Sequence, residues 1–96
     1  MTPAITLLTK KRIAHTVLKY DHDVNAASYG LEAVEKLNLN ADTVFKTLVV
    51  STDNNKLAVA VVPVNTKLSE KKMAKALGVK KVEMAQANAV MVATGY

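Results

Sequence analysis

Hydrophobic and polar positions are patterned most clearly in the middle of the chain, where two stretches predict a β-hairpin. Residues 43–51 and 56–62 are rich in apolar residues, and the valines among them are β-branched and suit strands. The polar run Thr52-Asp53-Asn54-Asn55 lies between them and favours a turn. Pro63 predicts the end of the second strand, because proline has no N–H to donate to a sheet.

Two helices are predicted before the hairpin. Thr2 followed by Pro3 is typical of an N-cap and a first helical residue, and this helix should end near Arg12. Apolar residues at helical spacing predict a second helix from about Ser28 to Leu37, with Asn38 as its C-terminal stop. We expect its inward positions to be Leu31, Val34 and Leu37, and its outward positions Glu32, Glu35 and Lys36.

Further elements are predicted on both sides of these. Residues 13–20 combine β-branched and aromatic side chains that suit a strand. After the hairpin, Ser69 and Gly78 bound a third helix, whose inward side chains we expect to be Met73, Ala76 and Leu77. Residues 79–84 suit a short strand, and an alanine-rich helix should begin at about Gln86.

The order of these elements predicts one α/β domain over residues 1–96. A helix, a strand and a helix precede the antiparallel pair, and a helix, a strand and a helix follow it. This order favours a mixed sheet with helices packed on it. Ninety-six residues suffice for one small core, which here is built mostly from alanine and valine.

Composition narrows the class of function. The chain has no cysteine, so disulfides, thiolate metal sites and a cysteine nucleophile are excluded. We expect a soluble cytoplasmic protein without a membrane segment, because no apolar run approaches the roughly 20 residues that a spanning helix needs. A net charge of +5 and lysine clusters at residues 10–12, 71–75 and 80–81 favour an anionic partner such as nucleic acid. Each cluster alone is more typical of a solvated helix surface than of a binding site, and the three together favour binding modestly.

Lys46 is the strongest candidate for a functional side chain. It lies in the run Val44-Phe45-Lys46-Thr47-Leu48-Val49-Val50, and a side-chain period of two places it on one face with Val44, Leu48 and Val50. A buried charge costs several kcal/mol unless it is paired, and this strand has no acidic residue. The pattern alone favours a lysine at the strand entrance that extends its amine into water. The alternative is that the ammonium group pairs with a ligand.

His22 lies between Asp21 and Asp23 and suggests a metal ligand or a general base. A polar triplet after a strand is more typical of a turn, and the other histidine, His15, lies inside a predicted strand. We therefore predict a turn at residues 21–23 and no metal site.

Several short motifs together resemble one family, the YbaK-type aminoacyl-tRNA deacylases, and specifically the cysteinyl-tRNA(Pro) deacylases. No motif is specific alone, but their order and spacing are, and they extend over the whole chain. They are Met1-Thr2-Pro3-Ala4-Ile5 with Leu7-Leu8, Tyr20-Asp21-His22-Asp23, Phe45-Lys46-Thr47-Leu48, Ala74-Lys75-Ala76-Leu77-Gly78 with Lys80-Lys81-Val82-Glu83-Met84, and Thr94-Gly95-Tyr96. The family continues past the last motif into a glycine-rich loop and further strands. The resemblance therefore implies the prolyl-tRNA synthetase-associated editing fold, C-terminally incomplete, and a chain without activity on its own.

The resemblance implies hydrolysis of cysteine wrongly attached to proline tRNA, in partnership with prolyl-tRNA synthetase. In this family the substrate's own thiol is thought to attack its ester carbonyl, so the protein supplies neither a nucleophile nor a cofactor. Lys46 matches the family's functionally important lysine, and it would contact the substrate carbonyl or a terminal phosphate. Thr47 would offer a hydroxyl, and Tyr20 would pack against the adenine or the substrate, although both are also ordinary strand residues.

Two alternatives remain open. The first is a deacylase for another mischarged tRNA, such as alanyl-tRNA(Pro), which the same fold and lysine would serve. The second is a non-catalytic tRNA-binding module, which the charge would explain. The chain lacks the aromatic pattern of an RRM and the GxxG of a KH domain, which weakens this second alternative.

Overall fold

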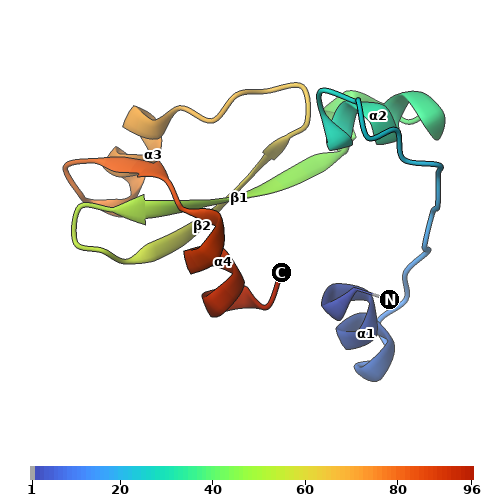
Figure 1. Cartoon of the computed structure of the whole chain (residues 1–96), viewed down its shortest axis with the longest axis horizontal. Coiled ribbons are helices and arrows are strands. Elements are labelled where there is room, and N and C mark those ends of the chain that lie inside the picture. Colours follow the sequence, from blue (N-terminus) through green and yellow to red (C-terminus); the bar gives the residue numbers. More distant parts are fainter. Residues whose placement is uncertain (1) are drawn as a thin grey trace.

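The computed structural model describes residues 2–96, and within them the chain forms short helices around a small sheet (Figure 1). The elements are α1 (Pro3–Lys10), α2 (Tyr29–Lys36), the 3-10 turn η1 (Ala41–Thr43), β1 (Phe45–Thr52), β2 (Leu57–Pro63), α3 (Glu70–Leu77), β3 (Val82–Met84) and α4 (Ala87–Thr94). Over this described part, every α-helix is far too short to cross a bilayer.

Side-chain caps begin three of the helices, as the sequence predicted. The hydroxyls of Thr2, Ser28 and Ser69 each accept a hydrogen bond from the backbone N–H three residues further on, at 3.2–3.4 Å. At the other ends, Asn38 just beyond α2 and Gly78 after α3 adopt left-handed backbone conformations with φ of 52° and 71°. The four predicted helices are therefore confirmed, with boundaries shifted by no more than two residues.

Strand β1 lies in the middle of a three-stranded sheet of order β2-β1-β3. It pairs with β2 in the predicted hairpin, where Lys46 lies opposite Val62. It pairs with β3 near its other end, where Val50 lies opposite Met84. Both pairings are antiparallel, so the prediction of a mixed sheet is wrong for the described residues. The reason is that the chain turns back after β1 in a tight hairpin to form β2. Helix α3 then connects β2 to β3, which runs in the same direction as β2 and so is also antiparallel to β1.

The predicted strand over residues 13–20 is also wrong. This segment contains no strand, and Ile13, Val17 and Leu18 remain 43–55% exposed. β-branched residues only suit a pleated surface, and a strand also needs a neighbour to hydrogen-bond with. The segment is instead an extended connection between α1 and α2, which Figure 1 shows running along one end of the molecule.

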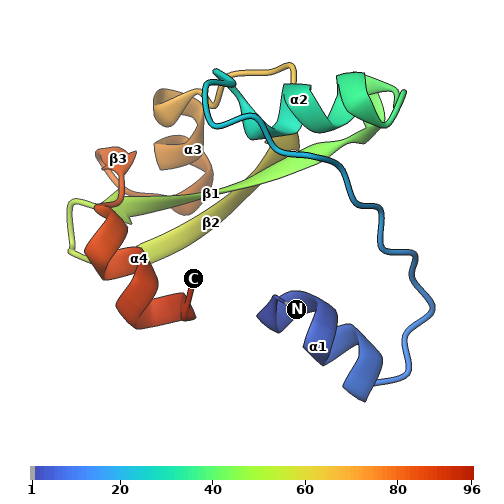
Figure 2. The ribbon, with the colours of Figure 1, turned by 45° about the vertical axis from the view of Figure 1, so that its right-hand side comes forward.

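One face of the sheet, here called the inner face, carries the core. It includes Val50, Ala60 and Val64, which are at most 7% exposed. Figure 2 shows α2 and α3 on this side of β1 and β2, and α4 on the other side. A cluster around Val50, formed with Ala74 of α3 and Val82 of β3, anchors α3 to the sheet.

The outer face is less covered. Phe45, Val59 and Val61 are 55–62% exposed there, because α4 lies over only part of the strands. Since successive side chains alternate between the faces, this exposure pattern fixes which residues of β1 point toward α2 and α3.

The predicted inward faces of two helices are confirmed in part, because Val34, Leu37 and Met73 are half-buried. The exceptions in α2 are Glu32, predicted outward but only 7% exposed, and Leu31, predicted inward but 45% exposed. In α3 the buried residue is Ala74, whereas Ala76 is exposed and Leu77 is 40% exposed. Eight-residue helices have too few positions for apolar spacing to fix their rotation, so tertiary contacts decide it.

The contact that orients α2 is made by Gly30. A Cβ atom added there would lie 2.4 Å from Cγ1 and 2.8 Å from Cβ of Val64, so the helix backbone lies directly against the inner face. Only glycine permits this approach.

We predict that Gly30→Ala destabilises the chain. Helix propensity alone would stabilise it by about 0.5–1 kcal/mol, but the clash with Val64 should reverse the sign and cost about 1–3 kcal/mol. Urea unfolding followed by circular dichroism measures the change. Glu35→Ala, on the exposed side of the same helix, is the control and should stay within about 0.5 kcal/mol of the parent. Unchanged or increased stability of Gly30→Ala would contradict the described packing.

Candidate functional site

Lys46 lies on the inner face of β1, where the alternation pattern places it. It pairs with Val62 in the hairpin and follows the inward-pointing Val44 by two residues. The side chain is half-buried, and within residues 2–96 neither of the two ion pairs includes it. Lys46 is therefore a half-buried cation on the inner face without an acidic partner among the described residues.

Thr47 points to the opposite face. With Val49, Val59 and Val90 it lines an apolar groove of about 520 Å³ between the outer face of the hairpin and α4. The structure thus separates Thr47 from Lys46 by the thickness of the sheet. The role predicted for Thr47 beside Lys46 stays a prediction without geometric support.

Tyr20 lies against α2, on the same side of the sheet as Lys46. Its phenol donates a hydrogen bond of 3.4 Å to the backbone carbonyl of Tyr29, and Nζ of Lys36 lies 6.0 Å from its ring centroid. Because Gly30 holds the start of α2 against Val64, Tyr20 is attached to the helix that covers the Lys46 face. The structure therefore places Tyr20 and Lys46 on one side, with Thr47 on the other.

Glu32 organises a polar cluster beside this site. Its Oε1 lies 2.6 Å from Nδ1 of His22, and its Oε2 accepts the N–H of Asp23 at 2.8 Å. Nζ of Lys36 lies 3.5 Å from the same Oε2. The hydrogen bond from His22 is the main cause that holds the pKa of Glu32 below its ordinary value, although burial opposes the shift.

The turn predicted at residues 21–23 begins only at Asp23. The N–H of Ala26 donates to the backbone carbonyl of Asp23 at 2.9 Å, and the N–H of Asn25 donates to Oδ1 of the Asp23 side chain, also at 2.9 Å. His22 instead anchors Glu32, a contact that sequence reasoning missed. The spacing of Glu32 and Lys36 signals their own ion pair, but no local pattern links Glu32 to a residue ten positions earlier. Residues 2–96 contain no group of three or more side chains suited to hold a metal ion.

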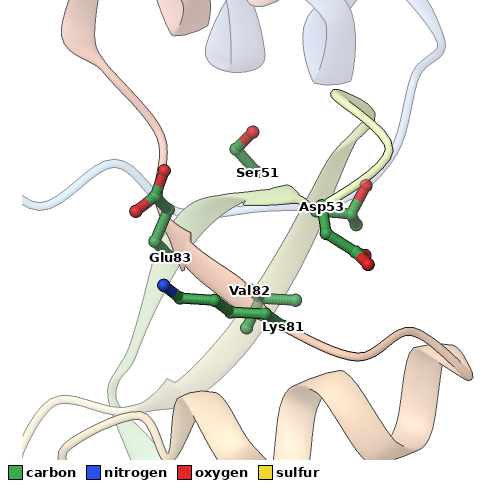
Figure 3. Close-up of a pocket in the computed structure, with 6 residues that line it drawn as sticks. Ser51, Asp53, Lys81, Val82 and Glu83 are labelled. Carbon is green, nitrogen blue, oxygen red and sulfur yellow. The ribbon is translucent and has the colours of Figure 1, made fainter.

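A recess at the C-terminal end of β1 is a weaker candidate for a functional site. It is about 70 Å³ in volume and lies where β3 joins β1. Ser51, Asp53 and Glu83 line it, and Figure 3 shows their side chains spread apart rather than converging on one point. The N–H of Asp53 donates to the carbonyl of Lys81 at 3.1 Å, so this recess belongs to the sheet junction.

Lysines gather around α3, and we call this group the α3 lysines. All are exposed, and none takes part in an ion pair among the described residues. They are Lys67, Lys71, Lys72, Lys75, Lys80 and Lys81. Two of them, Lys67 and Lys72, line a groove together with Val62, the residue opposite Lys46 in the hairpin.

Two comparisons identify the class of protein. Residues 23–96 match the model of the aminoacyl-tRNA editing domain, so the chain belongs to this family. A protein of Enterococcus faecalis with the provisional name Cys-tRNA(Pro)/Cys-tRNA(Cys) deacylase EbsC is 44% identical over 62 residues. The matched segment is 65% of this chain and 38% of EbsC, so the chain spans well under two thirds of that relative.

The family assignment confirms the resemblance drawn from the sequence motifs. Members of this family are aminoacyl-tRNA deacylases, which act on mischarged tRNA. The match includes β1 with Lys46 and the polar cluster from Asp23 onward, whereas Tyr20 precedes it.

We predict an acid-sensitive stability that depends on Glu32. Because its pKa is lowered in the folded chain, the unfolded chain takes up the proton first as the pH falls below about 4.5. The stabilisation is therefore complete above this pH and is lost as the pH falls through the lowered pKa. Urea unfolding between pH 7 and pH 3 should show this loss, and Glu32→Gln should flatten it. Glu35→Gln, on the same helix, should keep the parent profile, and identical profiles for all three chains would refute the role of Glu32.

Proposed function

We propose that this chain carries part of the site that hydrolyses cysteine wrongly esterified to proline tRNA, in partnership with prolyl-tRNA synthetase. The observation that carries the proposal is Lys46, a half-buried cation without an acidic partner among the described residues, in a chain of the aminoacyl-tRNA editing family. An unpaired ammonium group beside apolar surface is well suited to bind a group on which negative charge develops. The name of EbsC supports cysteinyl-tRNA as the substrate class.

The reaction needs little chemistry from the protein. The thiol of the substrate cysteine attacks its own ester carbonyl, so a sulfur–carbon bond forms and the bond from carbon to the ribose oxygen breaks. The amino acid leaves as a four-membered cyclic thioester, which water then hydrolyses to free cysteine. The thiol proton ends on the released ribose hydroxyl, and the tRNA leaves. Lys46 would stabilise the oxyanion that forms on the carbonyl, an electrostatic contribution that acts most strongly where water is excluded.

A separate editing step is physically reasonable for this substrate pair. Cysteine and proline have similar volumes, and a pocket that only accommodates a small side chain discriminates by about 1–3 kcal/mol. Hydrolysis at a second site then removes the wrong product.

The α3 lysines favour a surface that holds the tRNA itself. Two of them lie beside Val62, which pairs with Lys46, and phosphates bind positively charged surfaces with release of counterions. This surface is also the specific observation in favour of the second candidate function, a tRNA-binding module without activity.

We predict that Lys46→Ala in the product of the whole gene lowers the rate of cysteinyl-tRNA(Pro) deacylation by about 10²–10³-fold, the usual effect of removing one oxyanion contact. Seryl-tRNA(Pro) should resist the parent enzyme, because a hydroxyl is a far poorer nucleophile than a thiol. The release of labelled amino acid from each tRNA measures the rates.

Lys56→Ala is the matched control, because Lys56 is an exposed lysine at the hairpin turn and should leave the rate unchanged. Loss of alanyl- and seryl-tRNA(Pro) at comparable rates would instead favour a deacylase of another specificity. Survival of all three esters would overturn the enzymatic proposal and leave the binding module.

We also predict that tRNA binding depends on salt through the α3 lysines. Replacing Lys72 and Lys75 with glutamine should reduce the slope of log K against log salt concentration by about one for each lysine. Fluorescence anisotropy with labelled tRNA between 50 and 200 mM salt, as is usual for such slopes, measures it. The same double replacement at Lys10 and Lys11, where helix α1 ends, is the control, and equal slopes for both double variants would exclude a dedicated surface.

A further inference from the structure

His22 and Tyr29 form a stacked pair beside the candidate site. Their ring centroids lie 4.5 Å apart, with 24° between the ring planes. Tyr29 is 70% exposed, so most of its ring faces solvent even though one side packs on His22. An aromatic ring supported on one side and open on the other offers a flat surface to a second ring.

Hydrogen bonds to neighbouring residues hold both members of the pair in place. His22 is tied through Nδ1 to the buried carboxylate of Glu32, which also accepts the N–H of Asp23. Tyr29 is the first residue of α2, and Tyr20 donates to its backbone carbonyl. Exposed aromatic side chains are usually free to change rotamer, whereas here the imidazole and the helix start are both fixed. This is the arrangement expected of a preorganised binding surface.

The stack lies at the start of a helix that packs on the Lys46 face of the sheet. Gly30, the residue after Tyr29, packs on Val64, and the N–H of Val64 donates to the carbonyl of Val44 at 2.8 Å. Lys46 is the next inward residue of β1 after Val44, about 7 Å further along the strand. The helix that begins with Tyr29 is thus packed on the face of the sheet that carries Lys46.

We propose that the His22–Tyr29 stack binds an unpaired base at the single-stranded 3′ end of tRNA, with Glu32 as its positioning residue. This inference rests on the proposed function, since it assigns a place to the nucleotide whose ester would lie at Lys46. Unstacked bases at single-stranded ends are recognised mainly by stacking on aromatic side chains. Lys36, which is bound to Glu32 and to the carbonyl of Asp21, adds positive charge near the same surface for a backbone phosphate.

A short oligoribonucleotide that ends in CCA, with 2-aminopurine as its last base, tests the proposal without any need for catalysis. Stacking on the pair should quench its fluorescence on addition of the protein. Tyr29→Leu should remove the quenching and weaken binding by about 5- to 150-fold, the range that corresponds to the loss of one stacked base. Tyr29→Phe keeps the ring and should retain both signals.

Glu32→Gln tests the positioning role, because it keeps the side-chain shape but weakens the hold on His22. We expect reduced quenching at saturating protein, with circular dichroism confirming that the variant is folded. Phe45→Leu is the matched control, since it removes an aromatic that is 58% exposed on the outer face, and it should change neither signal.

Parent-like quenching and affinity in Tyr29→Leu would overturn the proposal, as would equal affinity for an oligonucleotide whose last residue lacks a base. These outcomes are distinguishable from failure of the proposed function. If ester hydrolysis depends on Lys46 while quenching does not depend on Tyr29, the stacking site alone is wrong. If quenching depends on Tyr29 while every ester survives, the stacking site stands and the enzymatic proposal falls.

Discussion

The ladder between β1 and β2 is the interaction on which the rest of the structure depends. Because β1 pairs with β2 along its length and with β3 near its end, its side-chain alternation is fixed for every residue. Val50 then closes the core under α3, and Lys46 emerges four residues earlier on the same face. A shift of one residue in this register would exchange Lys46 with Thr47 and place a hydroxyl where the cation now lies. The strand pairing therefore determines the chemistry of the site.

Much of this fold was predictable because local rules determine it. Hydroxyl caps and left-handed stops mark the helix ends, and the polar run at residues 52–55 marks the hairpin. Long-range contacts account for the errors. The extended segment at residues 13–20 has strand-like composition but no strand, and Glu32 is buried because His22 and Asp23 bind it. The spacing of apolar residues predicts neither the missing strand nor the burial of Glu32, because both depend on contacts between residues far apart in the sequence.

In the candidate site, too, the sequence predicted the features that local rules determine and missed those that long-range contacts determine. The face of Lys46 followed from strand periodicity, and the family assignment followed from motifs now supported by the comparisons. The separation of Thr47 from Lys46 also follows from alternation, which argues against a shared role for these adjacent residues. The network of His22, Glu32 and Tyr29 required the structure, because it joins a connecting segment to a helix through side chains that no sequence period relates. It ties the end of the connecting segment, at residues 20–23, to α2.

The most direct test of the account is a crystal structure of the whole gene product with an adenosine that carries cysteine through a non-hydrolysable amide at the 3′ position. The account predicts that the carbonyl lies within hydrogen-bond distance of Nζ of Lys46, on the inner face, with the adenine near Tyr29. Binding of the analogue in the outer groove beside Thr47 and Val59, with Lys46 left free, would contradict it.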